Sequence, residues 1–189
     1  MRIQPIIPIH RAEPFDDPAG AFELKLDGFR GMADTVGGRM LSKNGNRLKR
    51  FEPLLDSLPF GHVFDGEIVA VDEGGHPVFN DLLFGRHQPV YVPFDLMVTD
   101  SEDVRGATLK ERRAILANVV RRYRLQESEP VLGEGKAAFK AVRDLDLEGI
   151  IAKRLADPYD ADRTKWWKIL NPVYSQKEGR AELFERRYA

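Results

Sequence analysis

The chain has 189 residues, of which 42% are hydrophobic and 31% are charged, so it is long enough to bury a substantial core. Its 29 lysines and arginines balance 30 aspartates and glutamates, which leaves a formal charge of −1 and no overall attraction to nucleic acid or to a membrane surface. The absence of cysteine excludes disulfides, zinc–thiolate sites and cysteine nucleophiles, and the absence of a long apolar run leads us to expect a cytoplasmic protein without a membrane partner.

The N-terminal part of the sequence predicts irregular structure followed by strands. Residues 1–20 are rich in Pro, Asp and Ala, and they predict an irregular segment packed on the body of the protein. Residues 22–30, FELKLDGFR, alternate as a strand does, with Phe, Leu and Leu on one face and Glu, Lys and Asp on the other. Two more strands are predicted at 30–36 and 39–43, because the two glycines between them suit a tight hairpin turn.

The middle of the chain alternates short helical and strand patterns. Residues 50–59 carry a helical pattern that ends at Pro59. Residues 62–72 and 76–80 flank the turn sequence EGG and predict a second hairpin. The segment 89–98, PVYVPFDLMV, predicts a strand whose internal proline belongs near a sheet edge or an irregularity.

Residues 108–124 have the clearest helical pattern. The predicted apolar stripe of this helix consists of Leu109, Leu116, Val119, Val120 and Tyr123. The basic residues off this stripe, which we assign to a solvated face rather than to phosphate binding, are Lys110, Arg113, Arg121 and Arg124. A second helix is predicted at 133–146 and a buried strand at 149–154, so the elements together indicate a mixed α+β fold built mainly from hairpin-linked strands.

Three acidic residues stand within or at the start of apolar runs that read as buried strands. Glu67 precedes one run, Asp95 interrupts a second, and Glu148 precedes a third that ends in Lys153. A buried carboxylate is costly unless it is paired or binds a cation, and a structural ion pair explains any one of the three. Together with Lys25 near a glycine break, they predict a phosphate or metal site, and the residue pattern alone goes no further.

A series of motifs resembles the covalent nucleotidyltransferases, which include ATP-dependent DNA ligases, RNA ligases and mRNA capping enzymes. The stretch KLDGFR at 25–30 is similar to the K-x-D-G-x-R motif of that superfamily, and LSKNGNRL, FDGEIV, PFDLM, LEGIIAKR and KWWKIL follow in the family's order. The resemblance covers residues 22–170 and is strongest to the ligase domains of bacterial end-joining ligases and their short relatives. It implies the ligase/capping-enzyme nucleotidyltransferase (ATP-grasp-like) fold, with antiparallel sheets flanked by helices and the nucleotide between the sheets.

The resemblance also implies roles for the matched residues. Lys25 would be the nucleophile that takes AMP from ATP, and Lys168 would neutralise charge on the α-phosphate. Glu148 would hold Mg²⁺ or Mn²⁺. The remaining nucleotide contacts implied are Glu23 at the adenine edge, Phe94 stacked on the adenine, Arg30 and Glu67 at the ribose, and Asp27, Lys43 and Lys165 elsewhere on the nucleotide.

The sequence departs from the family pattern in two places. Leu170 stands where the last motif usually has a second lysine, and Lys165 could compensate only if the backbone brings it round. The residues after Lys168 are too few for the OB-fold domain that follows in ligases. We therefore expect a single adenylation domain over residues 1–189, with 171–189 as a C-terminal tail and no OB-fold domain.

The expected function is ATP-dependent DNA ligase-type adenylation, in which a lysyl-AMP intermediate forms and AMP passes to a 5′-phosphate at a DNA nick or end. Two alternatives stay open from the sequence: an RNA ligase-type enzyme, and a catalytically impaired module that binds nucleotide or DNA ends. The implied partners are nicked or broken DNA, or RNA in the first alternative, together with a separate OB-fold or end-joining protein.

Overall fold

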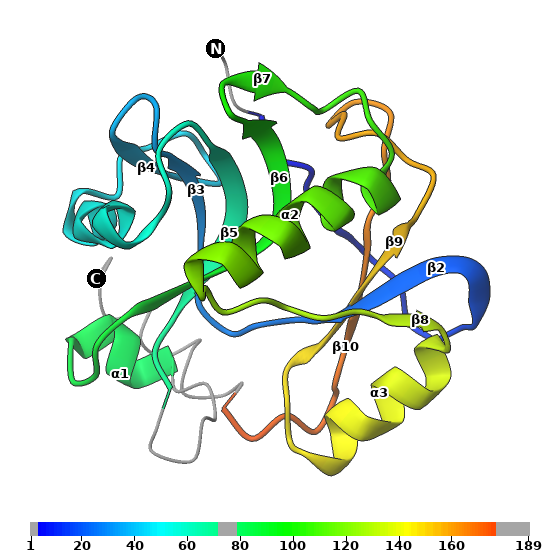
Figure 1. Cartoon of the computed structure of the whole chain (residues 1–189). Helices are drawn as coiled ribbons and strands as arrows, with labels where there is room; N and C mark the ends of the chain where they lie inside the picture. The colour runs from blue at the N-terminus through cyan, green and yellow to red at the C-terminus, as the bar shows by residue number, and fades with distance from the viewer. Residues whose placement is uncertain (1–3, 72–78, 177–189) are drawn as a thin grey trace.

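Two five-stranded sheets form the framework of this computed structural model, which describes residues 4–71 and 79–176 (Figure 1). The first sheet has the order β1 (Ile9–His10), β10 (Trp167–Leu170), β9 (Gly149–Arg154), β2 (Asp17–Leu24) and β8 (Val131–Gly133). The second has the order β4 (Arg39–Ser42), β3 (Phe29–Asp34), β5 (Val63–Val69), β6 (Val90–Thr99) and β7 (Glu102–Asp103). Neighbouring strands in both sheets are antiparallel except β1 and β10, which run parallel.

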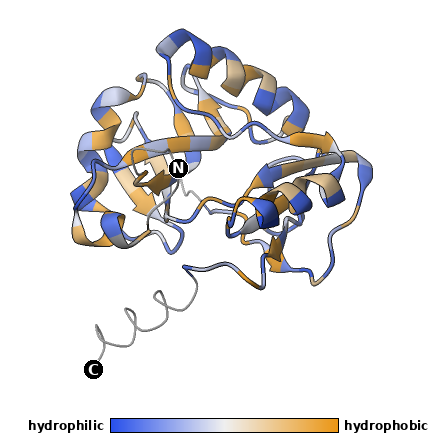
Figure 2. Ribbon diagram, turned by 90° about the horizontal axis from the view of Figure 1, so that it is seen from below, coloured by the Kyte–Doolittle hydropathy of each residue, from blue (hydrophilic) through white to orange (hydrophobic). Residues whose placement is uncertain are grey.

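Helices cover the sheets from outside. Helix α2 (Leu109–Tyr123) packs on β6, while α3 (Gly135–Asp144) packs on β2 and β9 of the other sheet (Figure 1). A 3₁₀ helix, η1 (Lys49–Ser57), lies beside β4, and a short helix, α1 (Phe79–Phe84), precedes β6. Figure 2 shows hydrophobic and hydrophilic residues mixed along the helices, as expected where one side meets a sheet and the other meets water.

Helix α2 is defined by its cap and by an unusual buried face. Thr108 and Glu111 form a capping box, in which each side chain accepts from the backbone N–H of the other. Arg113, predicted on the solvated face, is buried together with its neighbour Arg112, whereas the other predicted basic residues are exposed. Tyr123, predicted in the apolar stripe, is the last residue of the helix and is 45% exposed. The position of Arg113 is the correction that matters for the site.

Three other sequence predictions need adjustment. Strand β2 begins at Asp17, inside the segment predicted to be irregular, and it ends at Leu24, so that Lys25 follows the strand. Phe79 belongs to helix α1 rather than to a hairpin strand, and its ring packs 5.4 Å from that of Phe29, a long-range contact that local pattern cannot predict. The remainder of that predicted strand, 76–78, lies outside the described residues, as does 177–189 of the predicted tail.

The irregularity predicted for the proline-containing strand is present. The register between β5 and β6 shifts between the pairs Asp65–Asp95 and Gly66–Pro93. Within the part of the chain that the structure describes, β7 pairs with β6 at its end alone, so β6 is an edge strand around Pro93, where no backbone N–H is needed. No helix in residues 4–71 or 79–176 is long and apolar enough to cross a membrane.

Candidate functional site

A cavity of about 570 Å³ lies between the two sheets. One wall comes from the end of β2 and from β9 and β10, and the other comes from β3, β5, β6 and the segment after β4. The two sheets therefore create a site from residues far apart in sequence. The predicted residues that line it are Glu23, Lys25, Arg30, Lys43, Glu67, Phe94, Glu148 and Lys168.

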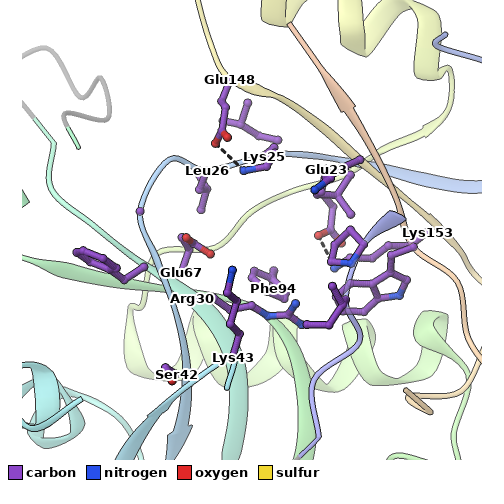
Figure 3. Close-up of a pocket in the computed structure, with 18 of the residues that line it drawn as sticks. Glu23, Lys25, Leu26, Arg30, Ser42, Lys43, Glu67, Phe94, Glu148 and Lys153 are labelled. Atoms are coloured by element: carbon purple, nitrogen blue, oxygen red, sulfur yellow. Dashed lines mark hydrogen bonds and ion pairs between the residues drawn. The ribbon is translucent and has the colours of Figure 1, made fainter. Parts of the chain in front are cut away.

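Lys25 and Glu148 form an ion pair in the cavity. Lys25 Nζ lies 2.6 Å from Glu148 Oε2, and both side chains are partly exposed (Figure 3). The pair is a consequence of sheet register, because β2 and β9 are neighbours and the Lys25 backbone N–H donates to the Gly149 carbonyl at 2.9 Å. The backbone of Glu148 is tied in turn to β10, since its carbonyl accepts from Asn171 N–H at 2.9 Å. A lysine is thus held at hydrogen-bond distance from a proton acceptor inside a cavity.

Glu67 faces this pair from β5, on the opposite wall (Figure 3). Burial raises the pKa of Glu67 to about 8, although the positive charges of Lys25 and Arg30 act in the opposite direction. The negative charge of Glu148 adds to the increase. Glu67 therefore retains a proton up to neutral pH in the folded protein without ligand.

Arg30 lines the cavity but already holds other protein groups. Its Nε donates to Asp65 Oδ1 at 2.9 Å, its Nη2 donates to the second oxygen of Asp65, and its Nη1 donates to the Ile6 carbonyl at 2.6 Å. Burial lowers the pKa of Arg30, but the carboxylate of Asp65 outweighs this effect and the net pKa is raised. The guanidinium carbon lies 5.5 Å from the ring centroid of Phe94 and 5.4 Å from that of Trp166. These contacts fix Arg30 as part of the cavity wall.

Asp27 packs behind the cavity, whereas Gly28 lines the cavity and packs against β5. Asp27 is buried and does not line the cavity, and its Oδ2 accepts from the Tyr174 hydroxyl at 2.9 Å. A Cβ added to Gly28 would lie 2.1 Å from the Ile68 carbonyl oxygen, which a real side chain never tolerates. This part of the motif thus lets the corner after Lys25 pack directly against the β5 backbone.

The last motif places one lysine in the cavity and one outside it. Lys168 and Leu170 alternate along β10, and both line the cavity. Lys165 precedes β10, is exposed and does not line the cavity. Lys165 therefore does not replace the missing lysine, and the apolar side chain of Leu170 occupies that part of the cavity wall.

Three residues of the site were not predicted. Lys153 Nζ forms an ion pair with Glu23 Oε2 at 2.6 Å, and it lies 4.5 Å and 4.2 Å from the ring centroids of Phe94 and Trp166. Burial lowers the pKa of Lys153, while Glu23 partly offsets this. Trp166 lines the cavity, and Arg113 lies behind it. A lysine that ends an apolar strand was the available signal for Lys153, whereas Arg113 had none.

A divalent cation fits the chemistry of this site only in part. Mg²⁺ binds one or two carboxylates and completes its shell with water and phosphate oxygens. Glu148 supplies one carboxylate in the cavity, and the described residues contain no group of three or more His, Asp or Glu residues placed to hold an ion. The donor set suits a metal that arrives with a phosphate ligand.

Two largely antiparallel sheets, with a lysine and carboxylates in the cavity between them, agree with the nucleotidyltransferase class that the motifs resemble. The chain belongs to the ATP-dependent DNA ligase domain family, and its match to that family covers residues 9–169. It is 28% identical over 197 residues to the SPbeta prophage-derived DNA ligase-like protein LigB of Bacillus subtilis, with 93% of this chain and 70% of that protein covered. It is 36% identical over 162 residues to the multifunctional non-homologous end joining protein LigD of Pseudomonas aeruginosa, with 78% of this chain and 19% of LigD covered.

Solved structures agree with this assignment. A mycobacterial DNA ligase D complexed with ATP and MES has a TM-score of 0.79 and 27% identity, over 89% of this chain and 60% of that one. The ligase domain of M. tuberculosis LigD has a TM-score of 0.75 and 26% identity, over 87% of this chain and 58% of that one. The predicted family and the predicted nucleotidyltransferase fold are confirmed, while this chain spans about a fifth of the length of P. aeruginosa LigD.

Proposed function

We propose that this domain uses ATP to form a covalent AMP adduct on Lys25 and then passes the AMP to the 5′-phosphate at a nicked or broken DNA end. The observation that carries the proposal is Lys25 Nζ at 2.6 Å from Glu148 Oε2, inside a cavity of about 570 Å³ that both sheets line. The cavity is of the size that small-molecule and cofactor sites have. A relative described as complexed with ATP, at 27% identity, supports the choice of nucleotide.

The chemistry at Lys25 is a nucleophilic substitution at phosphorus. The Lys25 amine attacks the α-phosphorus, a P–N bond forms, and the bond from that phosphorus to the oxygen bridging to the β-phosphate breaks. Pyrophosphate leaves with the electron pair of that bond. The attacking amine must first lose a proton, and Glu148 Oε2 is the acceptor in contact with it. Lys168 and Lys43 line the same cavity and would neutralise phosphate charge as it develops.

The other end of the cavity suits the base and ribose. Phe94 offers an aromatic face for stacking on adenine, Glu23 offers carboxylate oxygens for its amino group, and Glu67 and Arg30 lie where the ribose would pass. Glu148 would hold Mg²⁺ or Mn²⁺ together with phosphate oxygens and water, and the metal would lower the repulsion between the phosphates and the attacking group.

The test is transfer of label from α-labelled ATP to the protein in the presence of Mg²⁺. We expect label that survives denaturation, that is absent from Lys25→Ala, and that is retained in the control Lys110→Ala, whose lysine is exposed on α2. A protein that takes no label at any pH or with either metal would refute the proposal. The second candidate, a nucleotide- or end-binding module with impaired catalysis, would then apply, and Leu170 in the cavity wall favours it.

The substrate is tested by a chase of the labelled protein. We expect AMP to move to the 5′-phosphate of a nicked DNA duplex faster than to the same nick with RNA strands, and the reverse order would favour the RNA ligase alternative. We also propose that a separate OB-fold or end-joining protein helps to hold the DNA, because this chain matches 19% of a relative described as a multifunctional end-joining protein.

A further inference from the structure

Arg113 connects two residues of the cavity wall from behind. It projects from α2, is buried, and its Nη1 donates to Glu23 Oε1 at 2.8 Å and to the Phe94 carbonyl at 3.3 Å. Its Nη2 donates to the Ser128 carbonyl at 2.8 Å and lies 3.4 Å from Glu127 Oε1. One rigid guanidinium therefore orients the carboxylate of Glu23 and the backbone that carries the Phe94 ring.

Lys153 completes the arrangement from the other side. It is an ion-pair partner of the second oxygen of Glu23, and its ammonium lies over the ring of Phe94 at 4.5 Å (Figure 3). Glu23 is thus held between two cations, one at each oxygen. A carboxylate has about four lone-pair sites, so each oxygen of Glu23 can still accept a hydrogen bond from a ligand in the cavity.

We infer that Arg113 is a positioning residue that holds Glu23 and Phe94 as one unit for reading the base, and that this unit makes the site accept a 6-aminopurine and reject a 6-oxopurine. The inference rests on the proposed function, in which a purine nucleotide occupies this cavity. A fixed carboxylate accepts a hydrogen bond from the amino group of adenine but repels the carbonyl oxygen at the same position of guanine. A carboxylate free to turn away would lose that distinction.

The neighbouring arginine provides a matched control. Arg112 is also buried on α2, and it forms a two-point ion pair with Asp95 at 2.8 Å and 2.9 Å. Its other hydrogen bonds go to the carbonyls of Ala107 and Asp157, and none of these partners lines the cavity. Removing either arginine removes a buried charge pair on the same helix, but only Arg113 touches the proposed base-reading residues.

The experiment compares Arg113→Gln, Arg113→Lys and Arg112→Gln with the wild type, using adenylation and guanylation of the protein by labelled ATP and GTP. For Arg113→Gln we expect the ATP-over-GTP ratio of kcat/KM to fall about 10- to 100-fold, mainly through a higher KM for ATP. Arg113→Lys retains the charge and should recover part of the ratio. Arg112→Gln should lose thermal stability but keep the ratio within about twofold of wild type.

The outcomes separate this inference from the proposed function. An unchanged ratio in Arg113→Gln, or an equal change in Arg112→Gln, would show a purely structural role and overturn the inference while self-adenylation stands. If Arg113→Gln does not fold, Arg113→Lys decides, because an unaltered ratio and an unaltered KM for ATP in that variant also overturn it. A wild-type protein that takes no label from ATP would remove the proposed function and this inference together.

Discussion

The substitution Gly28→Ala tests whether the corner after Lys25 depends on direct packing against the β5 backbone. The new Cβ would lie 2.1 Å from the Ile68 carbonyl oxygen and 3.0 Å from the Cγ of Glu67. Because the first of these atoms belongs to the backbone, no side-chain rotation relieves the clash, and the start of β3 must move away from β5 at the Phe29–Ile68 pair. Overpacking of this kind costs about 1–3 kcal/mol or more, and each kcal/mol lowers the melting temperature of a domain of this size by about 2–4 °C.

The assay combines thermal denaturation, followed by circular dichroism, with transfer of label from ATP. We expect Gly28→Ala to melt several degrees below wild type and to label more slowly, because the walls that carry Lys25 and Glu67 are displaced. Gly106→Ala is the control, since a Cβ at Gly106 has no atom within 4 Å and should change neither quantity. If Gly28→Ala melted together with the wild type and Gly106→Ala, the packing argument for this glycine would be refuted.

Three further predictions concern the carboxylates, the base and the phosphates. The pKa of Glu67 is about 8 in the fold against 4.5 for an ordinary glutamate, so the folded state binds the proton more tightly than the unfolded state does. Without metal or nucleotide, the free energy of unfolding should therefore fall as the pH rises from 4.5 to about 8. Urea titrations at a series of pH values should show a flatter dependence for Glu67→Gln. Phe94→Ala should weaken ATP binding about tenfold or more through lost stacking, whereas Lys168→Ala should mainly slow adenylation. Calorimetry measures the binding and single-turnover labelling measures the adenylation rate. Equal and small effects of the two substitutions would contradict these roles. Tyr174→Phe removes the 2.9 Å hydrogen bond to the buried carboxylate of Asp27, so it should destabilise the fold by about 1.5–3 kcal/mol while ATP labelling persists. An unchanged midpoint of urea unfolding would contradict a stabilising role for this hydrogen bond.

Much of the candidate site was predictable because several of its charged residues stand beside apolar runs in the sequence. A charged residue next to an apolar run can be recognised in the amino-acid sequence, and this pattern alone marks Lys25, Glu67 and Glu148 as candidate site residues. The resemblance to nucleotidyltransferase motifs then supplies the chemistry. The distance between Lys25 and Glu148 could not be predicted, because it depends on β2 and β9 pairing in the register Leu24–Ile150, across more than a hundred residues of chain.

Arg113 and Lys165 show what sequence pattern cannot predict: Arg113 was expected in solvent and is buried, whereas Lys165 was expected at the nucleotide and is exposed. The helical pattern placed Arg113 with solvated cations, because periodicity identifies a face but not the carboxylate that a distant strand brings to it. Lys165 lies close to the last motif in sequence, yet it is exposed and outside the cavity, whereas its neighbour Trp166 lines the cavity. In both cases the surroundings of the side chain depend on how remote elements pack.

The sequence by itself determined the α+β class, the family and the order of the chemical groups, since these depend on local alternation and on short motifs. Tertiary structure alone decided which charges share the cavity, that Asp27 faces Tyr174 behind it, and that Glu23 is held between Lys153 and Arg113. The physical reason is that ion pairs and pKa shifts depend on distance and burial, and both are set by the pairing of strands and helices that are remote along the chain.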